Sequence, residues 1–374
     1  MTPRLPFRTL LAGALAASGL AACRRGEVSR VILPPGGLAV DSTGAIPRRF
    51  VDSSLVLEAS FGDATGRDTL LLQPVQLAAR DDRIFLFEAD QRIVCFDRSG
   101  RLLWTQGRPG GGPGEYRNVR DMRLGPDGNL WVLDPASARV TVVDPGGRVT
   151  RMVPTQGVGH SEVAVPVTDG IALVPAHAEQ DIEYLSTQGA PMASDSLPWA
   201  DYRALEYVAK AHRAAVDPVT GHWVLGFSYG NGWFAFGASP GTASQRRFYI
   251  EPTRFPAVVQ TVYDEGRAVG TGIVKPEFSA LDLALLRDTL YVLFIGKGPA
   301  AGRQVDRYAW SSGHYLGSLQ LPVEADYLAV TDHHLVLLTN HPLPRVLVFR
   351  RGPAADPGSG TAAADQPGPA GATR

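Results

Sequence analysis

The chain has 374 residues, and its 44% hydrophobic content is enough for one large domain or two smaller ones. Its 36 basic and 37 acidic residues nearly cancel, which gives a formal net charge of −1. Nucleic-acid binding normally needs a basic face, so we exclude nucleic acid as a partner.

Residues 1–22 predict a signal peptide. Arg4 and Arg8 precede an apolar stretch over residues 9–19. A helix needs about 20 apolar residues to span a bilayer, so this stretch is too short to be a membrane anchor and is typical of a secretory signal.

Residues 20–23, Leu-Ala-Ala-Cys, resemble the lipobox of bacterial lipoproteins. The resemblance implies cleavage before Cys23 and attachment of lipid to that cysteine. Because Arg24, and not Asp, follows the cysteine, it also implies an outer-membrane location facing the periplasm or the exterior. The alternative is an ordinary secretory signal in which Cys23 has no role.

Residues 23–47, with the sequence Pro-Pro-Gly-Gly at 34–37, predict a tether between membrane and domain. The Pro-, Gly- and Ala-rich residues 352–374 predict a disordered tail, because such a composition cannot bury a core. A globular domain is therefore expected over residues 48–351.

A sequence unit recurs inside this domain. Residues 83–88, 92–97 and 99–101 are repeated in order as 129–134, 139–144 and 146–148, a step of 46 or 47 residues. Each copy contains alternating, β-branched or aromatic residues typical of strands. A strand-rich repeat of about 40–45 residues indicates a propeller blade.

Weaker copies begin near residues 170, 221, 288 and 333, which makes six units. The sixth unit ends before its outermost strand, whereas residues 53–61 form a strand without a unit. We therefore predict an all-β, six-bladed β-propeller that is closed when the N-terminal strand completes the last blade.

Two stretches exceed the repeat. Residues 199–215 have roughly helical spacing and predict a short helix over one rim. Residues 238–279 are longer and contain strand-like segments at 247–250 and 257–259. Such insertions either form a binding face or widen a blade.

A glycine-rich linker, residues 107–116, joins the first two units. With its flanking repeats it resembles the linker of a family of bacterial six-bladed β-propellers related to NHL-repeat proteins, many of them secreted or lipid-anchored. The family implies the fold and the compartment but no single activity. The glycines favour a structural role at the crossing between blades, and the alternative is an anion-binding nest.

Candidate binding residues lie in the loops between second and third strands and in the linkers, which share one face of a propeller. Arginines in this set favour anionic or sugar ligands, and the alternative is a solvated charged rim. The candidates are Glu88, Arg92, Arg108, Glu115, Tyr116, Arg120, Arg139, His177, Tyr229, Arg303, His341 and Arg345.

Other chemistry is weakly indicated. Cys95 lies in an alternating strand and is expected to be a buried core residue. The adjacent His333 and His334 would point to opposite faces of a strand, and no other spacing requires a metal or organic cofactor. Asp134 and Asp144 are interpreted as turn acceptors for backbone amides.

We therefore expect a non-catalytic binding or scaffolding module that contacts a protein, a glycan or a small anionic ligand through its channel mouth and rim. The alternative is an enzyme, a lactone or glycan hydrolase or a lyase with or without a metal, because fold alone does not decide.

Overall fold

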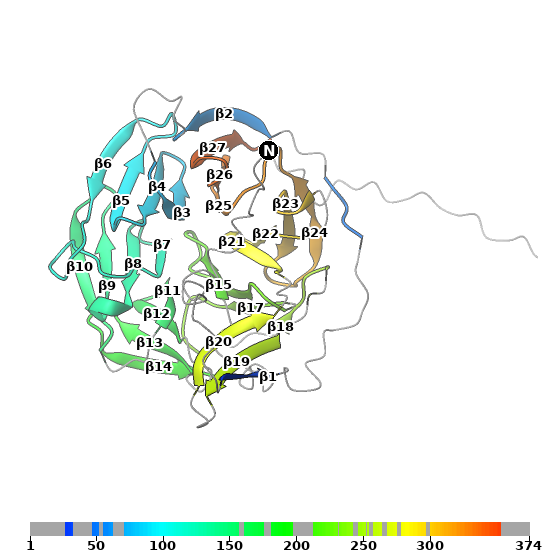
Figure 1. Ribbon diagram of the computed structural model, residues 1–374. Coiled ribbons are helices and arrows are strands. Elements are labelled where there is room, and N and C mark those ends of the chain that lie inside the picture. Colours follow the sequence, from blue (N-terminus) through cyan, green and yellow to red (C-terminus); the bar gives the residue numbers. More distant parts are fainter. Residues whose placement is uncertain are drawn as a thin grey trace, which may run out of the picture.

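The computed structural model describes residues 27–32, 47–51, 55–62, 71–156, 161–175, 181–196, 212–230, 232–241, 246–251, 253, 257–263, 268–274, 278–296 and 300–352. Within these residues the chain forms six four-stranded antiparallel sheets and one three-stranded sheet. The six sheets surround a common centre, as the blades of a propeller do (Figure 1). The predicted six-bladed, all-β architecture is confirmed.

Consecutive strands form each blade, with the first strand at the centre and the fourth at the rim. Blade 1 holds β3 (Pro74–Arg80), β4 (Arg83–Glu88), β5 (Arg92–Phe96) and β6 (Leu102–Gln106); blade 2 holds β7 (Asp121–Leu124), β8 (Leu130–Asp134), β9 (Arg139–Val143) and β10 (Val149–Pro154); blade 3 holds β11 (Ser161–Val167), β12 (Gly170–Pro175), β13 (Ile182–Ser186) and β14 (Pro191–Asp195). A 3₁₀ turn, η3 (Pro135–Ser137), joins β8 to β9.

The second half of the ring repeats this arrangement. Blade 4 holds β15 (His212–Val216), β16 (Trp223–Phe227), β17 (Trp233–Phe236) and β18 (Arg246–Arg247); blade 5 holds β21 (Ala280–Leu286), β22 (Thr289–Phe294), β23 (Gln304–Ala309) and β24 (Tyr315–Gln320); blade 6 holds β25 (Tyr327–Val330), β26 (His334–Thr339), β27 (Arg345–Arg350) and, as its rim strand, β2 (Val56–Phe61). No helix in the described part of the chain is long and apolar enough to cross a membrane.

The hydrophobic core of the described residues is divided into six clusters, each between two neighbouring blades. β4 shows why, because successive side chains on a strand point to opposite faces. Ile84 and Leu86 pack with blade 6, whereas Phe85 and Phe87 pack with blade 2. Strands that are buried on both faces consist mainly of apolar residues, which made the second and third strands of the clearest units recognisable.

Cys95 belongs to the cluster between blades 1 and 2 and is fully buried. Burial raises the pKa of its thiol to about 12. At neutral pH the side chain is therefore an inert, uncharged thiol, and its predicted role in the core is confirmed.

The N-terminal strand closes the ring, as predicted. β2 pairs antiparallel with β27, from Val56 opposite Arg350 to Phe61 opposite Val346. The Phe61 ring lies 5.2 Å from the ring of Phe96 in blade 1. The closing strand therefore supplies both the rim of blade 6 and part of the core that joins blade 6 to blade 1.

The three-stranded sheet corrects the prediction of a tether over residues 23–47. Residues Glu27–Ile32 form β1, which pairs antiparallel with β19 (Ala257–Tyr263), and β19 pairs in turn with β20 (Ala268–Val274). The three β-branched residues of β1 favour a strand, and pairing with β1 covers one edge of β19. The predicted strand at 257–259 is confirmed.

Several predictions concern residues outside the described ranges. These are the signal peptide over 1–22, lipidation of Cys23, His177, and the tail beyond residue 352.

The predicted helix over residues 199–215 is wrong where the structure describes it, from residue 212 onward. His212–Val216 is β15, the central strand of blade 4. Ala214 and Val216 pack in the cluster shared with blade 3, whereas Ala215 packs in the cluster shared with blade 5. This alternation has the period of a strand and tertiary packing overrides the helical propensity of alanine.

Residues 47–51 run along the rim of blade 5. The Val51 amide donates to the carbonyl of Ser318 at 2.9 Å, and the Ser318 amide donates to the carbonyl of Arg49 at 2.9 Å. These two bonds attach the segment to β24 before the chain continues into β2.

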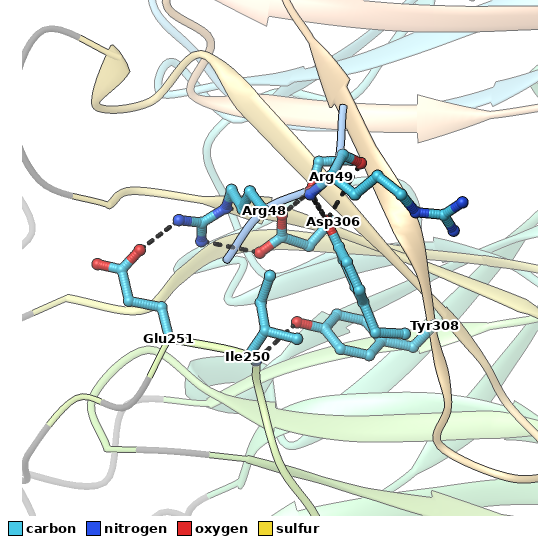
Figure 2. Close-up of polar contacts among 8 residues, drawn as sticks. Arg48, Arg49, Ile250, Glu251, Asp306 and Tyr308 are labelled. Carbon is cyan, nitrogen blue, oxygen red and sulfur yellow. Dashed lines mark hydrogen bonds and ion pairs between the residues drawn. The ribbon is translucent and has the colours of Figure 1, made fainter. Parts of the chain in front are cut away.

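Arg48 points from this segment into the protein (Figure 2). Its Nε and Nη2 atoms each donate to one oxygen of Asp306 at 2.9 Å, and Nη1 donates to Glu251. The guanidinium lies 4.7 Å from the ring centroid of Phe294, in cation–π geometry. Because Asp306 is fully buried, this bidentate pair is the neutralising partner of a carboxylate inside blade 5.

Candidate functional site

The centre of the ring contains polar contacts that pass from one blade to the next. Asp121 on β7 accepts a hydrogen bond from the amide of Ala164 on β11 at 3.0 Å. Asp282 on β21 accepts an equivalent bond from the amide of Leu328 on β25 at 2.9 Å. In both cases an aspartate on the central strand of one blade binds the backbone of the next central strand.

Two further central strands make the same connection with other side chains. Gln76 on β3 donates to the carbonyl of Arg120 at 3.2 Å, and Arg213 on β15 donates through Nε to the carbonyl of Leu281 at 2.6 Å. The pairing register places Gln76 opposite Phe87 and Arg213 opposite Gly226, which are equivalent positions on their second strands. These contacts therefore join four pairs of neighbouring central strands: β3 to the start of β7, β7 to β11, β15 to β21, and β21 to β25.

Arg123 reaches across the centre of the ring. Its Nε atom donates to Asp121 at 2.8 Å, and Nη1 donates to the carbonyl of Ala214 on β15. β7 belongs to blade 2 and β15 to blade 4, so this side chain passes the inner end of blade 3. We refer to the five residues that bring charge or a phenol to this region as the channel cluster: Asp121, Arg123, Arg213, Asp282 and Tyr327.

Burial dominates the electrostatics of the channel cluster. It raises the pKa of Asp282 to about 6, and the positive charges of Arg213 and Arg123 oppose the shift. The pKa of Asp121 is raised for the same reason. The pKa of Tyr327 is raised to about 12 by burial, so its hydroxyl is protonated at neutral pH and is a potential hydrogen-bond donor.

The predicted residue Tyr229 is influenced by the charge of Arg213, a member of the channel cluster. It is buried in the loop after β16, forms a β-bridge with Phe278, and lies with its ring centroid 4.8 Å from that of Phe278. Burial raises the pKa of Tyr229, and the charge of Arg213 lowers it. Tyr229 and Tyr327 thus both lie within electrostatic influence of Arg213.

His341 lies in the loop between β26 and β27 of blade 6. Its side chain is exposed, and its charge lowers the pKa of the neighbouring Asp326, which burial raises. Asp326 accepts a hydrogen bond from the amide of Asn340 at 2.7 Å and directly precedes Tyr327. Tyr229 is therefore linked to the channel cluster through the charge of Arg213, and His341 through Asp326, the residue before Tyr327.

Glu88 and Arg92 form a separate pair in blade 1. Glu88 is 1% exposed and accepts hydrogen bonds from the amide of Leu72 at 2.9 Å and from Arg92 at 3.1 Å. Arg92 also donates to Asp90 at 2.5 Å. Through the amide of Leu72, the Glu88 carboxylate holds the segment that leads into β3, so it binds the chain's own backbone.

Four predicted residues meet in the glycine-rich linker. Arg108 forms an ion pair with Glu115 at 2.6 Å, and Arg139 donates to three carbonyls of the linker. Glu115 also accepts from the amide of Gly112 at 2.7 Å, so its carboxylate occupies the place that an anion would take in a nest. Tyr116 is fully buried and donates to Gln106 at 3.0 Å. These contacts support the structural interpretation of the linker.

The remaining predicted residues that the structure describes, Arg120, Arg303 and Arg345, are dispersed around the ring. Arg120 and Arg303 have exposed side chains, and Arg303 donates to the carbonyl of Pro322 at 3.2 Å. Arg345 begins β27 opposite Thr339 and is partly exposed. Arg120 directly precedes Asp121 of the channel cluster, whereas Arg303 and Arg345 lie in blades 5 and 6.

The turn aspartates and histidines behave as the sequence predicted. Asp134 accepts from the amides of Arg117 and Asn118 at 2.9 and 3.1 Å, and Asp144 accepts from the amide of Arg148 at 2.9 Å. His333 and His334 diverge, with side-chain exposures of 73% and 5%.

His334 crosses the seam at which the ring closes. Its Nε2 atom lies 3.2 Å from Glu58 on β2 and 3.2 Å from Arg98 in blade 1. Its Nδ1 atom lies 3.5 Å from Asp81, also in blade 1. Across the described ranges, no three His, Cys, Asp or Glu side chains are placed to hold a metal ion.

The channel cluster was missed by the sequence analysis, which concentrated on loops. A signal was present in the central strands themselves. Asp121 and Arg123 both lie in the strand at 121–124, and Asp282 is the charged residue of the otherwise apolar strand at 280–286. A charge in the first strand of a propeller unit points toward the centre of the ring.

Six blades around this charged centre define a β-propeller, a class that contains both binding modules and enzymes. No protein-family model matches the chain, and no curated protein matches it in sequence. Solved structures with a similar chain path include a DUF4221-family member from Bacteroides vulgatus (10% identity, 81% of this chain and 99% of that chain, TM-score 0.49). Virginiamycin B lyase from Staphylococcus aureus (10%, 74% and 94%, TM-score 0.43) and the Neurospora crassa Pan2 WD40 domain (9%, 81% and 97%, TM-score 0.45) are also similar.

Proposed function

We propose that the protein is a lipid-anchored binding or scaffolding module of a bacterial envelope, related to NHL-repeat-like propeller lipoproteins. The lipobox-like residues 20–23 support attachment through Cys23. Arg24 in the position after the cysteine supports an outer-membrane location that faces the periplasm or the exterior.

The observation that carries the binding proposal is the combination of Arg213, Asp282 and Tyr327 on three central strands. These strands are held in register by hydrogen bonds between blades, so the side chains are presented on a rigid frame. An arginine beside a carboxyl and a phenol offers donors and acceptors that suit a glycan or a small anionic ligand.

A thermal-shift and calorimetric series tests the proposal. The probes are neutral oligosaccharides, uronic-acid oligosaccharides, and short acidic and basic peptides. We expect one class to raise the melting temperature of the wild type, and Tyr327→Phe to abolish that shift. Tyr184→Phe is the matched control, because the Tyr184 hydroxyl bonds to Asp195 in the outer part of blade 3. An equal shift in Tyr327→Phe, or no shift with any class, would show that the channel cluster is not the binding site.

One observation favours the second candidate, an enzyme. A carboxyl group whose pKa lies at about 6 beside an arginine and a tyrosine has the character of a general acid or base. Incubation of the wild type with the ligand class found above, followed by mass analysis, separates the two functions. Recovery of intact ligand supports binding, whereas turnover that is lost in Asp282→Asn supports the enzyme.

A further inference from the structure

The N-terminal segment is fastened to one side of the propeller. β1 pairs with β19 over six residues, from Glu27 opposite Tyr263 to Ile32 opposite Val258. Figure 1 shows β1, β19 and β20 together on the rim beside blade 4. β19 and β20 are inserted between blades 4 and 5, so this sheet belongs to that sector of the ring.

A second attachment lies in the same sector. Arg48 joins Glu251, which follows the last strand of blade 4, to Asp306 in blade 5. Two contacts separated by a short stretch of chain therefore fix the N-terminal segment to blades 4 and 5 before β2 crosses to blade 6.

Covalent geometry limits the distance between Cys23 and this sheet. Only four residue steps separate Cys23 from Glu27, and an extended chain spans at most about 3.6 Å per residue, or about 14 Å here. Arg24 and Arg25 occupy the first two of these positions, and basic residues next to a bilayer are attracted to anionic lipid headgroups.

We propose that the β1–β19–β20 sheet is the membrane-facing foot of the protein, held against the lipid headgroups with blades 4 and 5 nearest the bilayer. The proposal rests on the lipid anchor of the proposed function. Blade 1 follows blade 4 by three positions in a ring of six, so it points away from the membrane. The anchor then acts as a rigid mount that sets the orientation of the channel.

The test measures how close two labelled sites lie to lipid headgroups. Lipidated protein purified from bacterial membranes is incorporated into vesicles of phosphatidylethanolamine and phosphatidylglycerol that carry a nitroxide-headgroup lipid. A fluorophore is attached to Thr271→Cys on β20 or to Leu102→Cys on the rim of blade 1, where Leu102 is 47% exposed. Buried Cys95 does not compete for the label in the folded protein.

Thr271 is chosen because it is far from Cys23 in sequence, whereas a label on β1 would lie near the bilayer in a free tether as well. We expect quenching at residue 271 to be several-fold greater than at residue 102. A control variant carries a Gly/Ser segment of about 20 residues inserted between Arg25 and Gly26, with a root-mean-square span of about 25 Å. It is expected to remain on the vesicles and to lose most of the quenching at residue 271.

Flotation of the vesicles separates the two levels of the proposal. Protein that does not float with vesicles contradicts the lipid anchor and the membrane-facing foot together. Protein that floats with equal quenching at both sites, or whose quenching is unchanged by the inserted segment, retains the anchor and overturns the foot.

Discussion

Replacement of Arg48 is expected to lower the free energy of unfolding more than is usual for a residue in a rim segment. Removal of the Arg48 side chain would leave the carboxylate of Asp306, which is 0% exposed, without its bidentate ion pair. We predict that Arg48→Ala lowers the free energy of unfolding by about 3–5 kcal/mol, the usual cost of leaving a buried charge unpaired. Urea denaturation followed by tryptophan fluorescence measures this change.

The neighbouring Arg49 provides the control. It is exposed and donates only to the carbonyl of Leu316 in its side-chain contacts with the described residues. Arg49→Ala is expected to change stability by about 0.5 kcal/mol or less. Equal effects of the two substitutions would mean that the Asp306 pair contributes little.

Asp282 gives the protein a specific dependence on pH. Burial raises its pKa to about 6, above the value of about 3.9 for an unfolded aspartate. Between about pH 4 and pH 6 the folded state binds more protons than the unfolded state, so this group lowers the free energy of unfolding as pH rises through that window. Above about pH 6 the loss is complete.

Asp282→Asn removes the titration and keeps an acceptor for the amide of Leu328. We predict that the variant gains stability relative to the wild type as pH rises from about 4 to about 6, and that the difference is constant above. Denaturant unfolding at a series of pH values measures the difference. Parallel curves for the two proteins across this window would contradict the prediction.

At the level of residues, the sequence predicted core and turn roles well and the central site poorly. Cys95 and Asp144 have roles set by neighbours in their own strand or turn, which the local pattern contains. Arg123 and Arg213 both act on Asp121 only because the ring returns β7 and β15 to the same centre. Their relation depends on blade number and register, which no local pattern encodes.

Among the strands, β2 has a role out of proportion to its length. Phe61 at its end is 7% exposed and packs in the cluster that joins blade 6 to blade 1. We predict that Phe61→Ala lowers the free energy of unfolding by about 3–5 kcal/mol, because it opens a cavity at the seam of the ring. Chemical denaturation of the full chain measures the loss.

Leu57 on the same strand is the matched control. Its side chain is 51% exposed, so Leu57→Ala is expected to cost less than about 1 kcal/mol. If both substitutions cost the same, the strand contributes through its backbone pairing with β27 alone.

Strands that belong to the repeated sequence unit and have a strongly apolar pattern were predictable from the sequence. Strands that lack either feature were not. β4, β5 and β8 are mainly apolar on both faces, so they stand out from their turns. β15 was assigned to a helix because its alanines have no strand preference of their own. β1 was assigned to a tether because its partner lies more than 200 residues away in the chain.

For the whole molecule, the proposed lipid anchor leads to a prediction about location. Cys23→Ser is expected to move the protein from the membrane fraction to the soluble fraction while its thermal unfolding stays the same, because residue 23 precedes the first strand. Cys95→Ala, a change in the core between blades 1 and 2, is expected to remain with the membrane. Fractionation followed by immunoblotting measures both. A Cys23→Ser protein that stays with the membrane would show that another feature attaches it.

The pairing of β2 with β27 has a consequence for biogenesis. β2 precedes β27 by more than 280 residues, so during synthesis the first strand is made long before its partner exists. Closing so long a loop costs entropy that no local contact offsets beforehand, which makes completion of the last blade a late and slow step. Until then, β2 and β27 both expose unpaired backbone. A chaperone that shields such strands would therefore act on this protein before the circle is complete.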